Sequence, residues 1–350
     1  INDILLTAVL LGLQQWTGHE SWPIALEGHG RFDRDGAPDT TRTVGWFTAI
    51  YPVRLTIPAS RDLSTTLKSI KEQLRVVPGD GAAFCIQRLN HSNAAEPPPR
   101  ALVGFNYLGQ FAAADADGIF THAPQSTGES QCLDGTRAHS LDINALASGD
   151  QLSVTISYSD QQFNAQTVER LVALIESSLT ELINLCSDPS TCGYTPSDFP
   201  LAELDQTQLD SFAAHHGRGI EALYPLSPMQ AGMAFHTLLD ESGDAAYFEQ
   251  LTCRVDGNFD TDRFKRAWQT ALARHSVLRS GLWTAAQPPL QFVPRHVALP
   301  WHELDWRDLS DDEVAAQFDI LLARDRALGF DLSTPPLVRC QLVRIADTAW

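Results

Sequence analysis

The stretch Ile24–Leu55, IALEGHGRFDRDGAPDTTRTVGWFTAIYPVRL, decides the fold of the first half of the chain. Its apolar start predicts a strand that delivers Glu27 into a turn with two glycines, and a second long strand follows. Glycine permits left-handed backbone and lets a ligand approach closely. A carboxylate at a strand end, beside an imidazole and a guanidinium, can act as a general acid or base. The alternative is an ordinary charged turn with a solvated Glu27.

The first part of the chain contains four motifs in a fixed order, and one of them is the turn itself. They are NDILLTAV at 2–9, EGHGR at 27–31, RTVGWFTAIYP at 42–52 and FNYLGQF at 105–111. Together they resemble the signature motifs of epimerization domains in nonribosomal peptide synthetases, and the resemblance covers residues 1–186. Several motifs in register are far more specific than a single short motif.

This resemblance implies a set of site residues. Glu27 would be catalytic, and the residues expected to line the substrate and pantetheine cleft are Gly28, His29, Gly30, Arg31, Trp46, Asn106 and Tyr107. Two alternatives stay open at this stage. His29 and Arg31 either tune Glu27 or only hold the turn. Asn106 and Tyr107 either line the cleft or serve a strand-end turn and a packed ring whose hydroxyl lies in water.

The implied reaction is inversion at the Cα of an aminoacyl or peptidyl thioester carried on the 4′-phosphopantetheine arm of a peptidyl carrier protein. One group removes the α proton, the enolate is stabilised, and a second group returns a proton on the other face. By the resemblance, the second group is a histidine of an HHxxxDG motif in an upstream lobe. We therefore expect no directly bound cofactor and no metal, and we expect the 350 residues alone to be inactive.

A second resemblance covers the C-terminal part. YPLSPMQAGMAFHTLL at 224–239, ARHSVLRSGLW at 273–283 and FDLSTPPLVRCQLVRI at 330–345 resemble the first lobe of a condensation domain, ahead of its HHxxxDG motif. The segment 225–236 is more similar to condensation domains that accept a D-configured donor than to those that accept an L-configured donor. The alternative is that this helix only packs the lobe, with Met229 and Met233 in the core.

The region between the two resemblances predicts a linker. Hydrophobic periodicity fades over 187–220, where prolines and small polar residues interrupt the run. His215 and His216 begin an HHxxxDG-like string, but Ile220 stands where the aspartate belongs, so we interpret the pair as solvated linker histidines. The predicted domains are thus an epimerization part at 1–186, the linker, and a condensation lobe at 221–350.

The fold class expected from both resemblances is α/β, with chloramphenicol acetyltransferase-like two-layer lobes in two incomplete condensation-type domains. Local patterns agree. An apolar helix, with Asn2 as its cap, is stopped by Gly18, and amphipathic helices are predicted over 62–77 and 168–185. Alternating apolar residues over 141–158, with Gly149 in the loop, predict a hairpin.

Composition excludes some partners. The net charge of −18 disfavours nucleic acids and anionic membranes. Six scattered cysteines without CxxC spacing indicate neither a zinc site nor a disulfide framework, which fits a cytoplasmic protein. The apolar run at 4–13 has no basic segment before it and is too short to span a membrane. The start on a helix and the end in an expected strand suggest a piece of a longer protein.

Two other functions remain open: acyl transfer by the condensation part alone, or a non-catalytic role in docking between domains. An HHxxxDG motif upstream would support epimerisation, whereas one downstream would support condensation. The sequence contains no Walker loop, Rossmann fingerprint, GxSxG elbow or HExxH, so nucleotide-binding, hydrolase and metalloprotease functions are not indicated.

Overall fold

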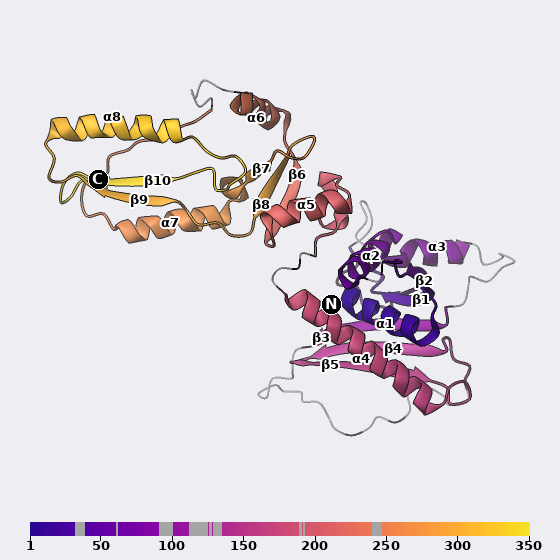
Figure 1. Ribbon diagram of the computed structural model, residues 1–350. Helices are drawn as coiled ribbons and strands as arrows, with labels where there is room; N and C mark the ends of the chain where they lie inside the picture. The colour runs from indigo at the N-terminus through magenta and orange to yellow at the C-terminus, as the bar shows by residue number, and fades with distance from the viewer. Residues whose placement is uncertain are drawn as a thin grey trace. The chain divides into compact units, whose positions relative to one another are not determined.

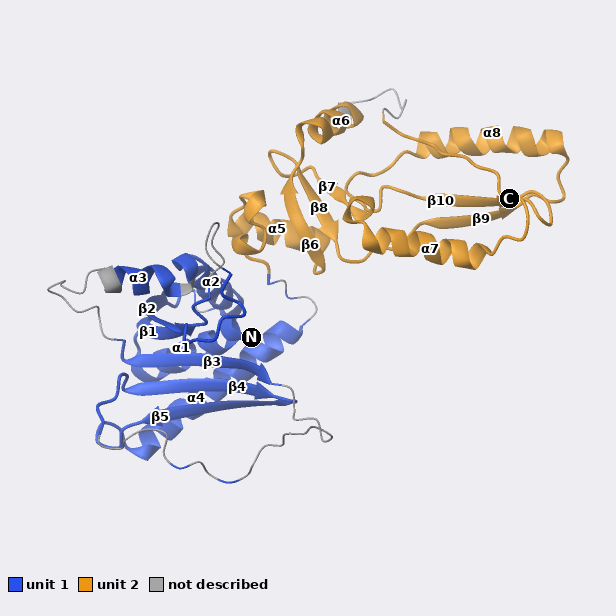
Figure 2. Cartoon of the chain, turned by 180° about the vertical axis from the view of Figure 1, so that it is seen from behind, with its two compact units in different colours: residues 1–193 blue, residues 194–350 orange. Residues whose placement is uncertain are grey.

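The computed structural model describes residues 1–31, 39–60, 62–90, 101–111, 125, 128, 135–188, 191, 193–239 and 247–350. These residues form two compact units, Ile1–Gly193 and Tyr194–Trp350, coloured blue and orange in Figure 2. Each unit combines helices with its own β-structure, so the predicted α/β class is confirmed.

Unit 1 is built on a mixed five-stranded sheet with the strand order β2-β1-β3-β4-β5. The β1–β2 and β4–β5 pairs are antiparallel, whereas β3 runs parallel to both β1 and β4. The β4–β5 pair is the hairpin predicted from the alternation. The strands are β1 (Ser21–Gly28), β2 (Ala49–Thr56), β3 (Val103–Phe111), β4 (Leu141–Ser148) and β5 (Gln151–Tyr158).

Helices cover one face of this sheet, where α1 and α4 lie side by side (Figure 1). Helix α1 is buried continuously from Leu5 to Leu13, because it lies between the sheet and its neighbouring helices. A Cβ on Gly12 would lie 2.5 Å from Ile175 Cγ1, so the glycine allows α1 and α4 to pack closely. The helices of this unit are α1 (Asn2–Thr17), α2 (Leu63–Arg75), η1 (Pro78–Gly81), α3 (Ala82–Asn90) and α4 (Ala165–Ser187).

Sequence signals identify some helix ends of unit 1 correctly and one incorrectly, and α4 extends beyond the predicted range of 168–185 at both ends. Gly18 ends α1 in the left-handed conformation, with φ 80°, as predicted. Asp62 caps α2 by accepting a hydrogen bond from the Thr65 amide. The prediction that Asn2 caps α1 is wrong. Ile1 occupies the cap position without a side-chain hydrogen bond, and Asn2 is the first helical residue.

Unit 2 contains two small sheets. Strands β6, β8 and β7 form an antiparallel sheet, and β9 pairs with β10 in parallel. The strands are β6 (Ile220–Pro225), β7 (Gly281–Trp283), β8 (Leu290–Pro294), β9 (Trp301–Asp305) and β10 (Cys340–Arg344). The helices are η2 (Pro196–Asp198), η3 (Pro200–Ala202), α5 (Gln206–His216), α6 (Pro228–Leu239), α7 (Thr261–Arg274), η4 (Ser276–Arg279) and α8 (Asp311–Leu328).

Much of the stretch predicted as a linker is packed structure. From Tyr194 onward it forms η2, η3 and α5, and Phe199, Leu209 and Phe212 are buried in the core of unit 2. The Tyr194 hydroxyl accepts a hydrogen bond of 2.7 Å from the Ile220 amide. The hydrophobic pattern fades here because short 3-10 helices bury isolated side chains, which leaves no helical or strand period to detect.

Helix α6 begins at the predicted capping box, in which Ser227 and Gln230 bond each other's backbone amides. The alternative that places Met229 and Met233 in the core is wrong, because these side chains are 77% and 37% exposed. The pattern shows which residues share a helix face but not whether another layer covers it. Among the α6 residues whose burial is described, only Ala234 is buried.

Candidate functional site

The site in unit 1 lies on the sheet face opposite the helices, and Glu27 reaches it because side chains alternate along β1. Ile24 and Leu26 are buried in the core, whereas Glu27 is exposed near the strand end. Its neighbour across the antiparallel pair with β2 is Ile50, which is 51% exposed. The carboxylate therefore stands on the uncovered side of a rigid strand.

Asn106 on the adjacent strand β3 fixes the orientation of this carboxylate. Its side-chain Nδ2 donates a hydrogen bond of 2.9 Å to Glu27 Oε2. The strand register continues the row through Asn144 on β4 and Thr155 on β5. A polar row thus crosses the open face, and two residues that belong to separate sequence motifs are in contact.

This face forms the floor of a cleft of about 1250 Å³. All five strands contribute residues to the floor of this cleft, and the segment before β4 and the end of β5 contribute to its wall. The polar side chains lining it are Glu27, Asn106, Thr136, Arg137, His139, Asp142, Asn144, Ser157, Tyr158, Ser159 and Asp160. A cleft of this size with several polar groups is typical of a small-molecule site.

The turn after Glu27 is held by Arg31. Its guanidinium donates hydrogen bonds to the carbonyls of Thr40 and Thr43, the latter at 2.7 Å, and stacks 4.0 Å from the centre of the Phe47 ring. The Arg31 amide also donates to His29 Nδ1 at 3.0 Å. These contacts favour the alternative in which Arg31 holds the turn over the one in which it tunes Glu27.

Glycine is required within this turn. Gly30 has a φ of 68°, and a Cβ there would overlap the carbonyl oxygen of Phe47. Gly28 ends β1 opposite Ala49. The glycine pair predicted to allow tight backbone therefore does so at Gly30, where the turn packs against the segment that enters β2.

Two of the candidate residues lie away from the cleft. Tyr107 packs against the helix-covered core, because it lies two residues after Phe105 on β3 and shares its face. Trp46 is 91% exposed and does not line the cleft. Among the candidates, Glu27 and Asn106 line the cleft, while Gly28, His29, Gly30 and Arg31 form the strand end and turn beside it.

Polar residues on β4 and just before it also line the cleft, although no sequence motif marks them. Asp142 accepts a 2.6 Å hydrogen bond from Arg137 Nη2, which also donates to the Ser157 carbonyl at 3.0 Å. His139 Nδ1 lies 2.9 Å from the Ala101 carbonyl. A signal was available: Asp142 and Asn144 alternate with the apolar residues of β4, so they occupy the face opposite the core.

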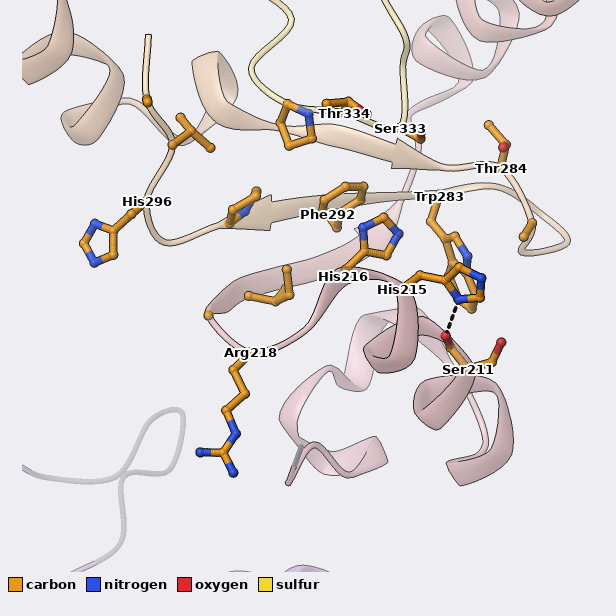
Figure 3. A pocket seen from close by; sticks show the side chains of 17 residues that line it. Ser211, His215, His216, Arg218, Trp283, Thr284, Phe292, His296, Ser333 and Thr334 are labelled. Atoms are coloured by element: carbon orange, nitrogen blue, oxygen red, sulfur yellow. Dashed lines mark hydrogen bonds between the residues drawn. The ribbon is translucent and has the colours of Figure 1, made fainter. Parts of the chain in front are cut away.

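A second pocket of about 830 Å³ lies in unit 2 (Figure 3). His215 Nδ1 donates a 2.8 Å hydrogen bond to the Ser211 carbonyl. The His216 ring packs between those of Phe212 and Phe292, at centroid distances of 4.7 and 4.3 Å. The interpretation of both histidines as solvated is therefore wrong for His216, which is half-buried because α5 packs against β8.

Burial lowers the pKa of His216, and the neighbouring His215 adds a smaller effect in the same direction. Ile220, which stands where HHxxxDG needs an aspartate, is buried in the core. Figure 3 shows the side chains of Arg218 and His296 pointing away from the His216 ring. His216 thus packs among aromatic rings, His215 is exposed, and the pair does not reproduce the HHxxxDG motif.

Over the described ranges, no group of three or more His, Cys, Asp or Glu side chains is arranged to hold a metal ion. In the same ranges, no helix combines the length and apolar character needed to cross a bilayer.

Comparison with known proteins identifies relatives along the whole chain. The family model described as "Condensation domain" matches residues 1–204 and 220–350. One subunit of the linear gramicidin synthase of Brevibacillus parabrevis is 40% identical over 100% of this chain and 5% of its own length. One subunit of the mycosubtilin synthase of Bacillus subtilis is 36% identical over 98% of this chain and 13% of its own length.

A solved structure is also similar to part of the chain. The epimerization domain from the third module of tyrocidine synthetase B is 34% identical, covering 53% of this chain and 42% of that one, with a TM-score of 0.48. The family match covers most of the sequence, so the chain belongs to the condensation-domain family. It spans only a small part of the gramicidin and mycosubtilin synthase subunits.

Proposed function

We propose that unit 1 is part of an epimerization domain of a nonribosomal peptide synthetase, and that it inverts the Cα of an aminoacyl or peptidyl thioester. The substrate would be carried on the 4′-phosphopantetheine arm of a peptidyl carrier protein of the same synthetase. The observation that carries the proposal is the Glu27 carboxylate, held by Asn106 at 2.9 Å over the cleft. The motifs around it and the family match support this assignment.

Glu27 has the chemistry that this reaction needs. Its carboxylate can take or return the α proton, which the thioester carbonyl acidifies, and the Asn106 amide holds one of its oxygens. Inversion requires a second acid-base group on the other face of Cα. We propose that an HHxxxDG histidine of an upstream lobe supplies it.

The test uses the complete synthetase module that contains this chain. A carrier loaded with an L-aminoacyl or L-peptidyl thioester is incubated in D₂O, and deuterium at Cα and the D/L ratio are followed with time. Glu27→Gln keeps the shape but removes the exchangeable charge, so we expect the rate to fall on the order of 10²-fold or more. Glu176→Gln, an exposed carboxylate on α4, is the matched control.

Parent and control should exchange at the same rate. Equal exchange in the Glu27→Gln variant would return Glu27 to an ordinary charged turn. A parent module without any exchange, although its carrier is loaded, would instead favour the docking role.

We also propose that unit 2 begins a condensation unit that selects a D-configured donor. The family match over 220–350 and the similarity of the α6 segment to D-accepting domains support this. A domain that receives a mixture of epimers gains specificity by clashing with the wrong Cα substituent. The complete downstream domain should form peptide bonds faster with a D-terminated donor thioester than with its L epimer, and equal rates would contradict the proposal.

A further inference from the structure

A polar corner of the cleft lies two residues along the strands from Glu27 and Asn106. It is formed by His139 and Asp142 above Gly104 on β3. Both side chains reach this place because Gly104 has no side chain. A Cβ there would lie 2.7 Å from His139 Cδ2 and 2.8 Å from Asp142 Oδ1. The glycine thus creates the space in which the two polar groups meet over the sheet.

The hydrogen bonds of this corner define which atoms face a ligand. A backbone carbonyl only accepts, so the 2.9 Å contact of His139 Nδ1 with the Ala101 carbonyl places a proton on Nδ1. In the neutral ring, Nε2 is then a hydrogen-bond acceptor. Asp142 holds Arg137 through Oδ2, while Oδ1 lies over Gly104. The corner therefore presents acceptors and suits a ligand with an N–H donor.

The distance to Glu27 matches the geometry of an amino acid. Ala25 pairs with Gly104, and Glu27 follows two residues later, so the corner is offset from Glu27 by roughly 7 Å along the strand and about 4.8 Å across to the next strand, or roughly 8 Å in all. A Cα that reacts with Glu27 lies about 3–3.5 Å from the carboxylate. The N–Cα bond adds about 1.5 Å, and a hydrogen bond from nitrogen adds about 3 Å. These lengths together span the offset.

We propose that His139 is a substrate-binding residue that accepts a hydrogen bond from the α-nitrogen N–H of the carrier-bound thioester. This inference rests on the proposed function of Glu27. The bond fixes the N–Cα axis and turns the Cα proton toward Glu27, so the cleft accepts aminoacyl and peptidyl groups that carry an N–H on the reacting residue. It discriminates against a peptidyl group whose α-nitrogen is methylated, because that nitrogen has no proton to donate.

Two substitutions of His139 separate its proposed hydrogen bond to the substrate from its hydrogen bond to the Ala101 carbonyl. In His139→Asn the amide nitrogen replaces Nδ1 at the Ala101 carbonyl, but nothing occupies the position of Nε2. In His139→Gln the longer amide reaches the position of Nε2 and gives up the Ala101 contact. With an N–H substrate in the complete module, we expect His139→Asn to lower kcat/KM about three- to tenfold, the range of one neutral hydrogen bond. His139→Gln should recover part of this loss.

The methylated substrate supplies the decisive readout. Aminoacyl, peptidyl and N-methyl peptidyl thioesters on the same carrier are compared in the deuterium-exchange assay. The parent should process the N-methyl substrate about as slowly as His139→Asn processes the peptidyl one, and His139→Asn should not slow the N-methyl substrate further. Gly104→Ala, whose Cβ displaces both side chains of the corner, should reproduce the selective loss.

The possible outcomes test the role of His139 separately from the proposed role of Glu27. No exchange in the parent overturns both. Exchange in the parent with an unchanged rate in His139→Asn overturns the role of His139 and leaves Glu27 in place. An equal loss on N–H and N-methyl substrates overturns recognition of the α-nitrogen. Thermal unfolding of each variant identifies a loss that comes from misfolding.

Discussion

Replacing Asn106 with alanine tests whether the hydrogen bond to Glu27 contributes to catalysis. The substitution removes the 2.9 Å bond from Nδ2 to Glu27 Oε2 and leaves the backbone of β3 unchanged. A hydrogen bond to a charged group contributes about 1.5–3 kcal/mol, and exposure of Glu27 to water reduces this to about 1–2 kcal/mol. At about 1.4 kcal/mol per tenfold in rate, we expect kcat for α-proton exchange to fall about five- to thirtyfold.

The assay is Cα deuterium exchange of a carrier-bound thioester in the complete module, with kcat and KM determined separately. Thr155→Ala, in the same polar row but two strands away, should leave the rate unchanged. If Asn106 acts by orienting Glu27, Asn106→Ala should have little further effect in a Glu27→Gln background. Additive losses in the double variant would refute the reasoning, since they would give Asn106 a role independent of the carboxylate.

Gly30→Ala should abolish most epimerisation while the melting temperature of unit 1 changes little, because the new Cβ overlaps the Phe47 carbonyl in an exposed turn; retained exchange would contradict this. Gly12→Ala should destabilise the chain by up to about 2 kcal/mol in urea unfolding, since overpacking against α4 outweighs the gain in helix propensity. Gly232→Ala, with open space around its Cβ in α6, should instead raise the free energy of unfolding by about 0.5–1 kcal/mol. If Gly12→Ala and Gly232→Ala changed the free energy of unfolding equally, the packing argument for Gly12 would be refuted. Burial lowers the pKa of His216, so the unfolded state binds the proton more readily than the folded state does. The free energy of unfolding should therefore be constant above about pH 6.5 and should decrease as the pH falls below that value. His216→Leu should weaken this pH dependence, which is measured by unfolding at pH 7.5 and 5.5.

The sequence predicts those parts of the fold that local patterns encode. The alternation in β4 and β5 indicates the hairpin, and the glycine after α1 marks its end. Motifs identify Glu27 and Asn106, but the contact between them depends on the parallel pairing of β1 with β3, which no local period reveals. His139 escapes prediction for a related reason, since its place in the cleft depends on a missing Cβ at Gly104, more than thirty residues earlier.

Errors in the prediction arise where burial depends on distant layers. The methionines of α6 follow a helical period, yet the period cannot tell whether another element covers that face. Conversely, Phe212 lies in a region without a clear period and is fully buried, because α5 packs on β8 through this ring and His216. The sequence therefore predicts the faces of elements more reliably than the partners of those faces.

Side chains alternate between the two faces of the unit 1 sheet, so one face contributes to the core and the other lines the cleft. Leu26, Phe105 and Ile143 face the helices and contribute to the core, while their neighbours Glu27, Asn106 and Asn144 face the cleft. Substitution of one of these polar cleft residues removes little buried apolar area, so it should lower the free energy of unfolding less than substitution of a core residue does. A loss of exchange in these variants therefore reports on the reaction and not on the fold, whereas Leu26→Ala should lower both by opening a cavity in the core.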